Sequence, residues 1–135
     1  MMRYEFNTYR TSDKFLDIKF LFVETTPSNW RAYILTEINY QSVERERSEL
    51  ITIIHRLTES NTDMRTRVLN FIRENEIPYN RQTINYICWS STVRSLESMR
   101  EVAKTWSEIT SYYIQHGGTF DTIQPLLKSR GIITL

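Results

Sequence analysis

The stretch SLESMREVAKTWSEITSYYIQH, residues 95–116, decides the fold, because its apolar side chains keep one helical face along its whole length. Ser95 precedes the run as a helix N-cap does, and Glu97 places a negative charge in the first turn. Gly117 follows it and suits a left-handed C-cap. The face consists of Leu96, Met99, Val102, Ala103, Trp106, Ile109, Tyr113 and Ile114. This spacing predicts a long amphipathic helix over 95–116.

Three upstream segments carry the signals of β-strands. Residues 15–24, FLDIKFLFVE, alternate, with Ile18 on one face and Lys19 on the other, as a half-buried strand does. Residues 4–10 and 30–38 are rich in aromatic and β-branched side chains. Short connections favour antiparallel neighbours, so we expect an N-terminal meander.

The remaining segments complete an α+β fold. Residues 42–58 are ambiguous, because SVERERSE is helix-prone whereas ITII is β-branched. We expect a short helix and then a strand over 51–58, although its apolar residues also suit a continued helix. The fold expected for a single domain, 1–135, is an antiparallel sheet of about four to five strands (the meander plus 51–58 and 84–89) with helices 62–75, 95–116 and 121–129 packed on one face.

Composition narrows the classes of partner. The 135 residues carry a net charge of +1, which is too small for a broad nucleic-acid footprint. No apolar run reaches the length of a membrane span, and the single cysteine forms no internal disulfide, so we expect a cytoplasmic protein without a membrane partner. Two histidines and one cysteine, widely spaced, predict no metal site, and we expect no cofactor.

Catalytic signatures are missing from the chain. It contains no phosphate-binding glycine loop, no nucleophile elbow and no zinc-protease motif, so we expect a non-enzymatic protein. Cys88 is the one thiol, and burial as a small apolar side chain is typical of free cysteine. The alternative is a reactive thiol beside Arg94 and the start of the long helix, with His55 or His116 as its partner.

The segments IIHRL and YICW place a histidine-bearing strand before the lone cysteine of a small α+β fold. In this they are loosely similar to ubiquitin-conjugating enzymes, a resemblance that covers about ten residues and implies a Cys88-dependent activity. The family's His-Pro-Asn motif is absent here, and His55 lies well before the cysteine strand.

Arginine supplies 13 of the 17 cations. Its planar fork suits carboxylate or phosphate recognition and stacking on rings, although ion pairs with the 16 acids are the alternative. Serines and Arg94 before the long helix are typical of an anion site, unless Arg94 pairs with Glu97 or Glu101. The sequence thus predicts capture of a small anionic ligand, such as a nucleotide, by an accessory or phage-type sequestering protein. The candidate ligand-binding residues are Arg56, Trp89, Ser91, Arg94, Arg100, Tyr112 and His116.

Two further expectations concern macromolecular partners. The alternative function is a protein–protein interaction module or an inhibitor of a macromolecular partner, since aromatic residues and arginines are enriched at such surfaces. A homodimer is expected, to which the apolar tail over 131–135 or the long helix contributes, with a ligand near Arg94 and Arg100. The tail could equally return to its own chain.

Overall fold

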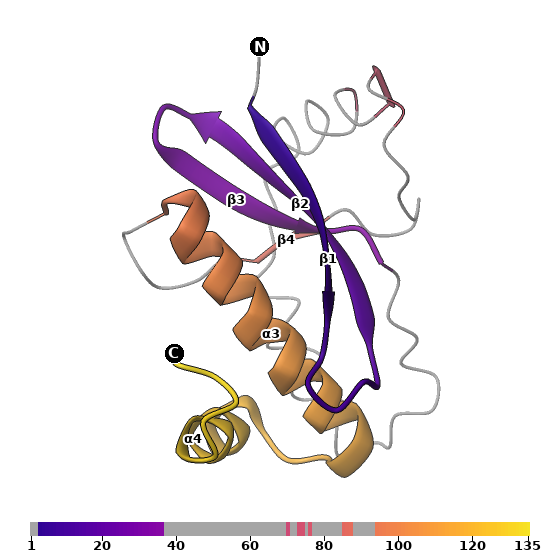
Figure 1. The fold of residues 1–135 in the computed structure, drawn as a ribbon, viewed down its shortest axis with the longest axis vertical. Helices are drawn as coiled ribbons and strands as arrows, with labels where there is room; N and C mark the ends of the chain where they lie inside the picture. Colours follow the sequence, from indigo (N-terminus) through magenta and orange to yellow (C-terminus); the bar gives the residue numbers. More distant parts are fainter. Residues whose placement is uncertain (1–2, 37–69, 71–72, 75, 77–84, 88–93) are drawn as a thin grey trace.

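The computed structural model describes residues 3–36, 70, 73–74, 76, 85–87 and 94–135. The elements are β1 (Tyr4–Arg10), β2 (Asp17–Thr26), β3 (Asn29–Ile34), β4 (Asn85–Tyr86), α3 (Leu96–His116) and α4 (Phe120–Ser129). Figure 1 shows α3 crossing one face of the sheet, with α4 and the C-terminus beside α3. An antiparallel sheet with helices on one face confirms the predicted α+β class.

The sheet has the order β1-β2-β3-β4, and every neighbouring pair is antiparallel. β1 covers the predicted residues 4–10, but β2 starts two residues later than expected. The reason is the turn, in which the Thr11 N–H donates to the Leu16 carbonyl at 3.0 Å. β3 ends at Ile34, earlier than the predicted residue 38.

The two faces of β2 are buried to different extents along its length. Ile18 is buried whereas Asp17 and Lys19 are exposed, as the alternation predicts. Farther along, Leu21 and Val23 are buried too, so the sheet is covered on both faces there and the half-buried expectation is wrong for these positions. A strand buried on both faces loses its alternating pattern, because neither face needs polar side chains.

The core lies between the sheet and α3. Phe20 packs edge-on against Trp106, with ring centroids 6.2 Å apart and an interplanar angle of 85°. Such a T-shaped contact adds about 0.5–1.5 kcal/mol to the burial of the two rings. The buried cluster is Ile18, Phe20, Phe22, Trp30, Ala32, Ile34, Ile87, Met99, Val102, Ala103, Trp106, Ile109, Tyr113, Ile123, Leu127 and Ile133.

The caps of α3 follow the sequence closely. The Ser95 hydroxyl accepts from the Ser98 N–H at 3.1 Å, as an N-cap does. Gly117 ends the helix, and its N–H donates to the Tyr113 carbonyl at 2.8 Å. Its φ of 75° needs glycine, but its ψ of −160° lies outside the left-handed helical region that the sequence predicted.

The C-terminal tail docks on its own chain. After α4, which starts one residue before the predicted 121, Ile133 is buried in the core cluster. The Gln124 Nε2 donates to the carbonyl of Leu135 at 2.8 Å, and the Thr134 hydroxyl to Glu101 at 3.3 Å. Of the two places that the sequence left open for the tail, the structure shows this chain's own core.

Several predicted elements fall outside the described residues, including the helix and strand expected over 42–58. Of the helix expected over 62–75, only residues 70, 73 and 74 are described, and they are helical. The strand expected over 84–89 is described as the two-residue β4 and a bridge at Ile87. Three strands of six to ten residues are therefore shown, and a full set of four to five is more than these residues show. No helix in the described part is long and apolar enough to cross a membrane.

Candidate ligand pocket between β1 and α3

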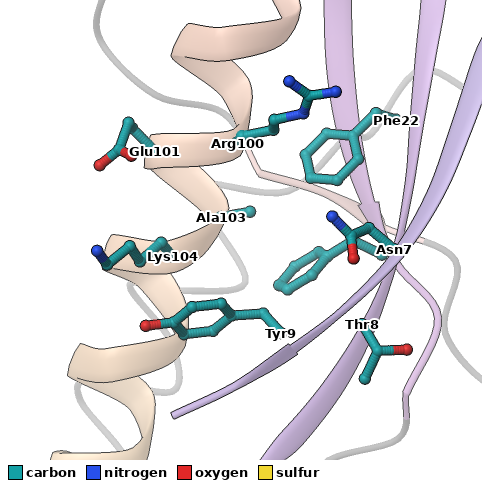
Figure 2. A pocket seen from close by; sticks show the side chains of 9 residues that line it. Asn7, Thr8, Tyr9, Phe22, Arg100, Glu101, Ala103 and Lys104 are labelled. Atoms are coloured by element: carbon teal, nitrogen blue, oxygen red, sulfur yellow. The ribbon is translucent and has the colours of Figure 1, made fainter. Parts of the chain in front are cut away.

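A hollow of about 180 Å³ lies where α3 passes the edge strand β1. Figure 2 shows the helix on one side, β1 on the other and aromatic rings between them. We call this hollow the β1–α3 pocket. Its lining is Asn7, Thr8, Tyr9, Phe20, Phe22, Arg100, Glu101, Ala103 and Lys104.

The floor of the pocket is aromatic. Phe20 and Phe22 are consecutive residues on the α3 side of β2, and their ring centroids are 6.0 Å apart. Both are almost fully buried as residues, so only small areas of their rings face the pocket. The hollow exists because α3 places Ala103 opposite them, and a methyl group leaves the space that a larger side chain would fill.

One end of the pocket is closed by an ion pair. The Arg100 guanidinium donates through Nε to Glu5 at 2.7 Å and through its Nη2 to the second carboxylate oxygen. This two-pronged contact holds the pKa of Glu5 below its usual value, chiefly through the hydrogen bond from Arg100. The predicted ligand-binding Arg100 therefore does line the pocket, but its fork is occupied by this chain's own carboxylate.

Tyr9, which lines the pocket, contacts Glu108, a buried carboxylate of α3. The Glu108 carboxylate accepts from the Tyr9 hydroxyl at 2.7 Å, the Ser12 N–H at 2.7 Å and the Ser12 hydroxyl at 3.0 Å. Burial of Tyr9, its hydrogen bond to Glu108 and the nearby negative charges all raise the pKa of Tyr9, so it stays a donor. Three donors to one buried carboxylate leave little capacity for another ligand.

A second carboxylate fixes the tip of the β1–β2 hairpin to α3. Asp13 accepts from the Ser111 hydroxyl at 2.7 Å, from Gln115 Nε2 at 2.7 Å and from the Phe15 N–H at 3.0 Å. Partial burial raises its pKa most, but hydrogen bonds from Thr11, Ser111, Phe15 and Gln115 together outweigh burial and lower the pKa to about 2. We call Glu108 and Asp13 with their donors the hairpin clamp.

Two polar side chains of the lining have no hydrogen-bond or ion-pair partner in the described chain. In the described chain, Lys104 has no carboxylate within ion-pair distance, and the Asn7 amide makes no hydrogen bond. Figure 2 shows Asn7 beside the rings on β1, while the Lys104 ammonium is drawn on the side of α3 that faces away from them. The ammonium would reach the mouth only after rotation about the bonds of the flexible lysine side chain. The pocket thus offers an apolar floor, one cation and one amide.

The predicted site residues do not converge on one place. Arg56, Trp89 and Ser91 lie outside the described residues, as does Cys88. Tyr112 and His116 stack with ring centroids 4.6 Å apart at the end of α3. They follow Arg100 by 12 and 16 residues, so His116 lies about 24 Å along the helix axis from it.

The remaining arginine of the predicted set, Arg94, lies just before α3 and outside the pocket lining. Its carbonyl accepts the Trp30 N–H at 2.8 Å, which joins the chain before α3 to β3.

Several arginines instead interact within the chain. Arg3 lies over the Trp30 ring at 5.5 Å, and Arg31 over the Tyr86 ring at 4.6 Å. Arg10 approaches Asp17 at 3.8 Å. These contacts support the alternative explanation of the arginine content, that much of it serves internal pairing.

Sequence reasoning missed the residues that build the pocket, above all Asn7, Tyr9 and Lys104. A partial signal was available, because Arg100 and Lys104 are four residues apart on one helical face and Asn7 and Tyr9 alternate on one strand face. Only the placement of β1 beside α3 brings the two pairs together. Among the described residues, no group of three His, Cys, Asp or Glu side chains is placed to hold a metal ion.

Comparison of the chain with protein-family models, with curated proteins and with solved structures finds no match.

Proposed function

We propose that the chain is a cytoplasmic, non-enzymatic binding protein for a small organic anion with a single aromatic ring, held in the β1–α3 pocket. The observation that carries the proposal is the pairing of an aromatic floor, Phe20 and Phe22, with an uncommitted cation, Lys104. An aromatic carboxylate matches both, because its ring packs on the floor and its charge is met by the ammonium. The Asn7 amide supplies a further donor to the carboxylate.

The size of the pocket selects the ligand. An apolar cavity of roughly 150 Å³ holds a benzene ring, whereas sites for larger organic ligands span about 300–1,000 Å³. At about 180 Å³, the β1–α3 pocket has room for one ring and a small substituent. A nucleotide, with base, ribose and phosphate, exceeds that volume, so we narrow the anionic ligand to a single-ring acid.

Calorimetric titration with benzoate tests the proposal. A ligand of about nine non-hydrogen atoms at roughly 0.5 kcal/mol each binds near the millimolar range, so protein at high concentration is needed. We expect Lys104→Met to weaken benzoate binding at least about tenfold, since it removes the charge and keeps the side-chain length. Lys128→Met, at an exposed lysine of α4, is the matched control and should bind as the parent does.

Three outcomes separate the alternatives. Benzyl alcohol, which has the ring without the charge, should bind more weakly than benzoate, and acetate should not bind measurably. Absence of benzoate heat from the parent protein, or equal affinity in Lys104→Met, would overturn the proposal. Adenosine monophosphate binding more tightly than benzoate would restore the nucleotide prediction and reject the size argument.

An interaction module or an inhibitor of a macromolecular partner is the second candidate function. The observation that favours it is the exposure of aromatic side chains on β1, of which Phe6 is 42% exposed. A Cys88-dependent activity stays a prediction, and the Cys88→Ser variant tests it.

A further inference from the structure

The exposed apolar surface of the described chain is concentrated on one hairpin. Its exposed large hydrophobic side chains are Tyr4, Phe6 and Phe15, and all lie on β1 or in the turn that follows it. β1 stands at the end of the sheet order, so no described strand pairs with its outer edge. An exposed edge strand that carries apolar side chains is a template for pairing with another strand.

The backbone of β1 shows which residues would pair. The Glu24 N–H donates to the Arg3 carbonyl at 2.9 Å, which makes these two a hydrogen-bonded pair of the antiparallel ladder. Hydrogen-bonded and non-bonded pairs alternate, so the odd-numbered residues of β1 bond to β2. The even-numbered residues direct their N–H and C=O groups outward. They are Tyr4, Phe6, Thr8 and Arg10.

We propose that a second copy of this chain pairs with that edge, β1 against β1, antiparallel about a two-fold axis at Asn7. In this register the outward-facing residues are opposite one another, so they exchange backbone hydrogen bonds in pairs. Phe6 lies opposite the partner's Thr8 and diagonal to the partner's Phe6, within reach of an aromatic ring. This diagonal contact covers part of each exposed Phe6 ring.

The charges of β1 favour a second copy over an unlike strand. Its two charged residues, Glu5 and Arg10, sum to zero, and the antiparallel register places no like charges opposite each other. Arg10 lies opposite the partner's Tyr4, where a guanidinium gains a cation–π contact. Its present contact with Asp17 is long, and both side chains are more than 60% exposed, so Arg10 is available for that role.

Pairing of this kind stops at two copies and borders the ligand pocket. It uses the one long edge of the described sheet, because the opposite edge strand, β4, has only two residues. Asn7 and Tyr9 line the β1–α3 pocket, so the partner's strand lies directly beside the pocket mouth. The proposal does not depend on the ligand, since strand order, exposure and register carry it.

Sedimentation equilibrium at tens of micromolar measures the assembly directly. We expect the parent to have twice the 16.2 kDa mass of one chain. Thr8→Pro removes an outward N–H and leaves the β1–β2 hydrogen bonds intact, so it should give a folded monomer with an unchanged circular dichroism spectrum. Phe6→Lys is the second variant, because it places like charges diagonally across the axis without altering the backbone.

Phe15→Lys is the matched control, since it removes a similarly exposed aromatic residue from the turn and not from the strand. It should remain dimeric. A 16.2 kDa parent at these concentrations would overturn the proposal. So would a dimer that persists in folded Thr8→Pro and in Phe6→Lys, or one that is lost equally in Phe15→Lys.

Discussion

The β1–β2 hairpin contacts α3 at two places, and these differ in whether their polar groups already form hydrogen bonds or ion pairs. In the hairpin clamp, Glu108 and Asp13 accept hydrogen bonds from donors on both elements. In the β1–α3 pocket, Lys104, about one turn before Glu108 on α3, and Asn7 on β1 have no such partners in the described chain.

This difference separates the structural region from the functional one. A buried carboxylate that has three donors stabilises the fold and has little left to offer a ligand. A cation without a carboxylate partner, beside a hollow lined by aromatic rings, contributes little to the fold and is available for binding. Ionisable residues alone do not mark a site, because the two carboxylates of the clamp already accept hydrogen bonds from within the chain. The pocket differs from the hairpin clamp in having polar groups that can still hydrogen-bond to a ligand.

Glu108→Ala should have the largest effect on stability. It leaves the Tyr9 hydroxyl, the Ser12 N–H and the Ser12 hydroxyl without their acceptor, and these donors are partly buried. We expect the free energy of unfolding to fall by about 2–4 kcal/mol, measured by urea denaturation. Glu101→Ala is the control, because Glu101 is exposed and accepts one long hydrogen bond from Thr134. Equal losses in both variants would show that the clamp is not a stabilising network.

Asp13 makes the clamp pH-dependent. Its folded-state pKa, about 2, lies below the ordinary 3.8, so the carboxylate stabilises the fold above the unfolded pKa, and this is lost as pH falls toward 2. A pKa shift of this size corresponds to roughly 2 kcal/mol in the free energy of unfolding without solvent screening. Screening at this exposed position reduces that contribution to about 1 kcal/mol.

Urea denaturation of the parent and Asp13→Asn from pH 7 to pH 2 measures this contribution. We expect the variant to be less stable by about 1 kcal/mol at neutral pH and the two curves to converge near pH 2. Asp17→Asn removes a carboxylate from the same hairpin. Its difference in stability from the parent should change less between pH 7 and pH 2 than that of Asp13→Asn. A difference between parent and Asp13→Asn that stays constant down to pH 2 would contradict the low pKa.

The sequence predicts those parts of the fold that depend on local patterns. The range of β1 agrees to the residue and that of α3 to within one, because aromatic alternation and the helical stripe report burial directly. The burial of Leu21 and Val23 departs from the half-buried strand that was expected over 15–24, since nothing within that segment shows that the sheet is covered on both sides. The C-cap at Gly117 was placed correctly, although its ψ was not.

The site was less predictable for a physical reason. A pocket arises from what is missing between elements, here the side chain that Ala103 lacks opposite Phe20 and Phe22. An alanine on the apolar stripe looks like any other core residue until its neighbours on β2 are known. Arg100 was identified as an anion-binding residue from its chemistry alone, and its partner Glu5 is 95 residues away in the sequence.

The smallest expected effects concern the two cations of the pocket, Arg100, which is paired with Glu5, and Lys104, which has no carboxylate partner in the described chain. Arg100→Met should change benzoate affinity by less than about twofold, because the guanidinium already donates to Glu5. Glu5→Gln frees the fork at the pocket's end, so it should raise benzoate affinity by roughly threefold, an increase that salt diminishes by screening these exposed charges. Titrations of both variants at low and high salt measure these changes. Loss of benzoate binding in Arg100→Met, with no gain in Glu5→Gln, would show that the ligand displaces Glu5 and that Arg100 is the anion-binding group after all.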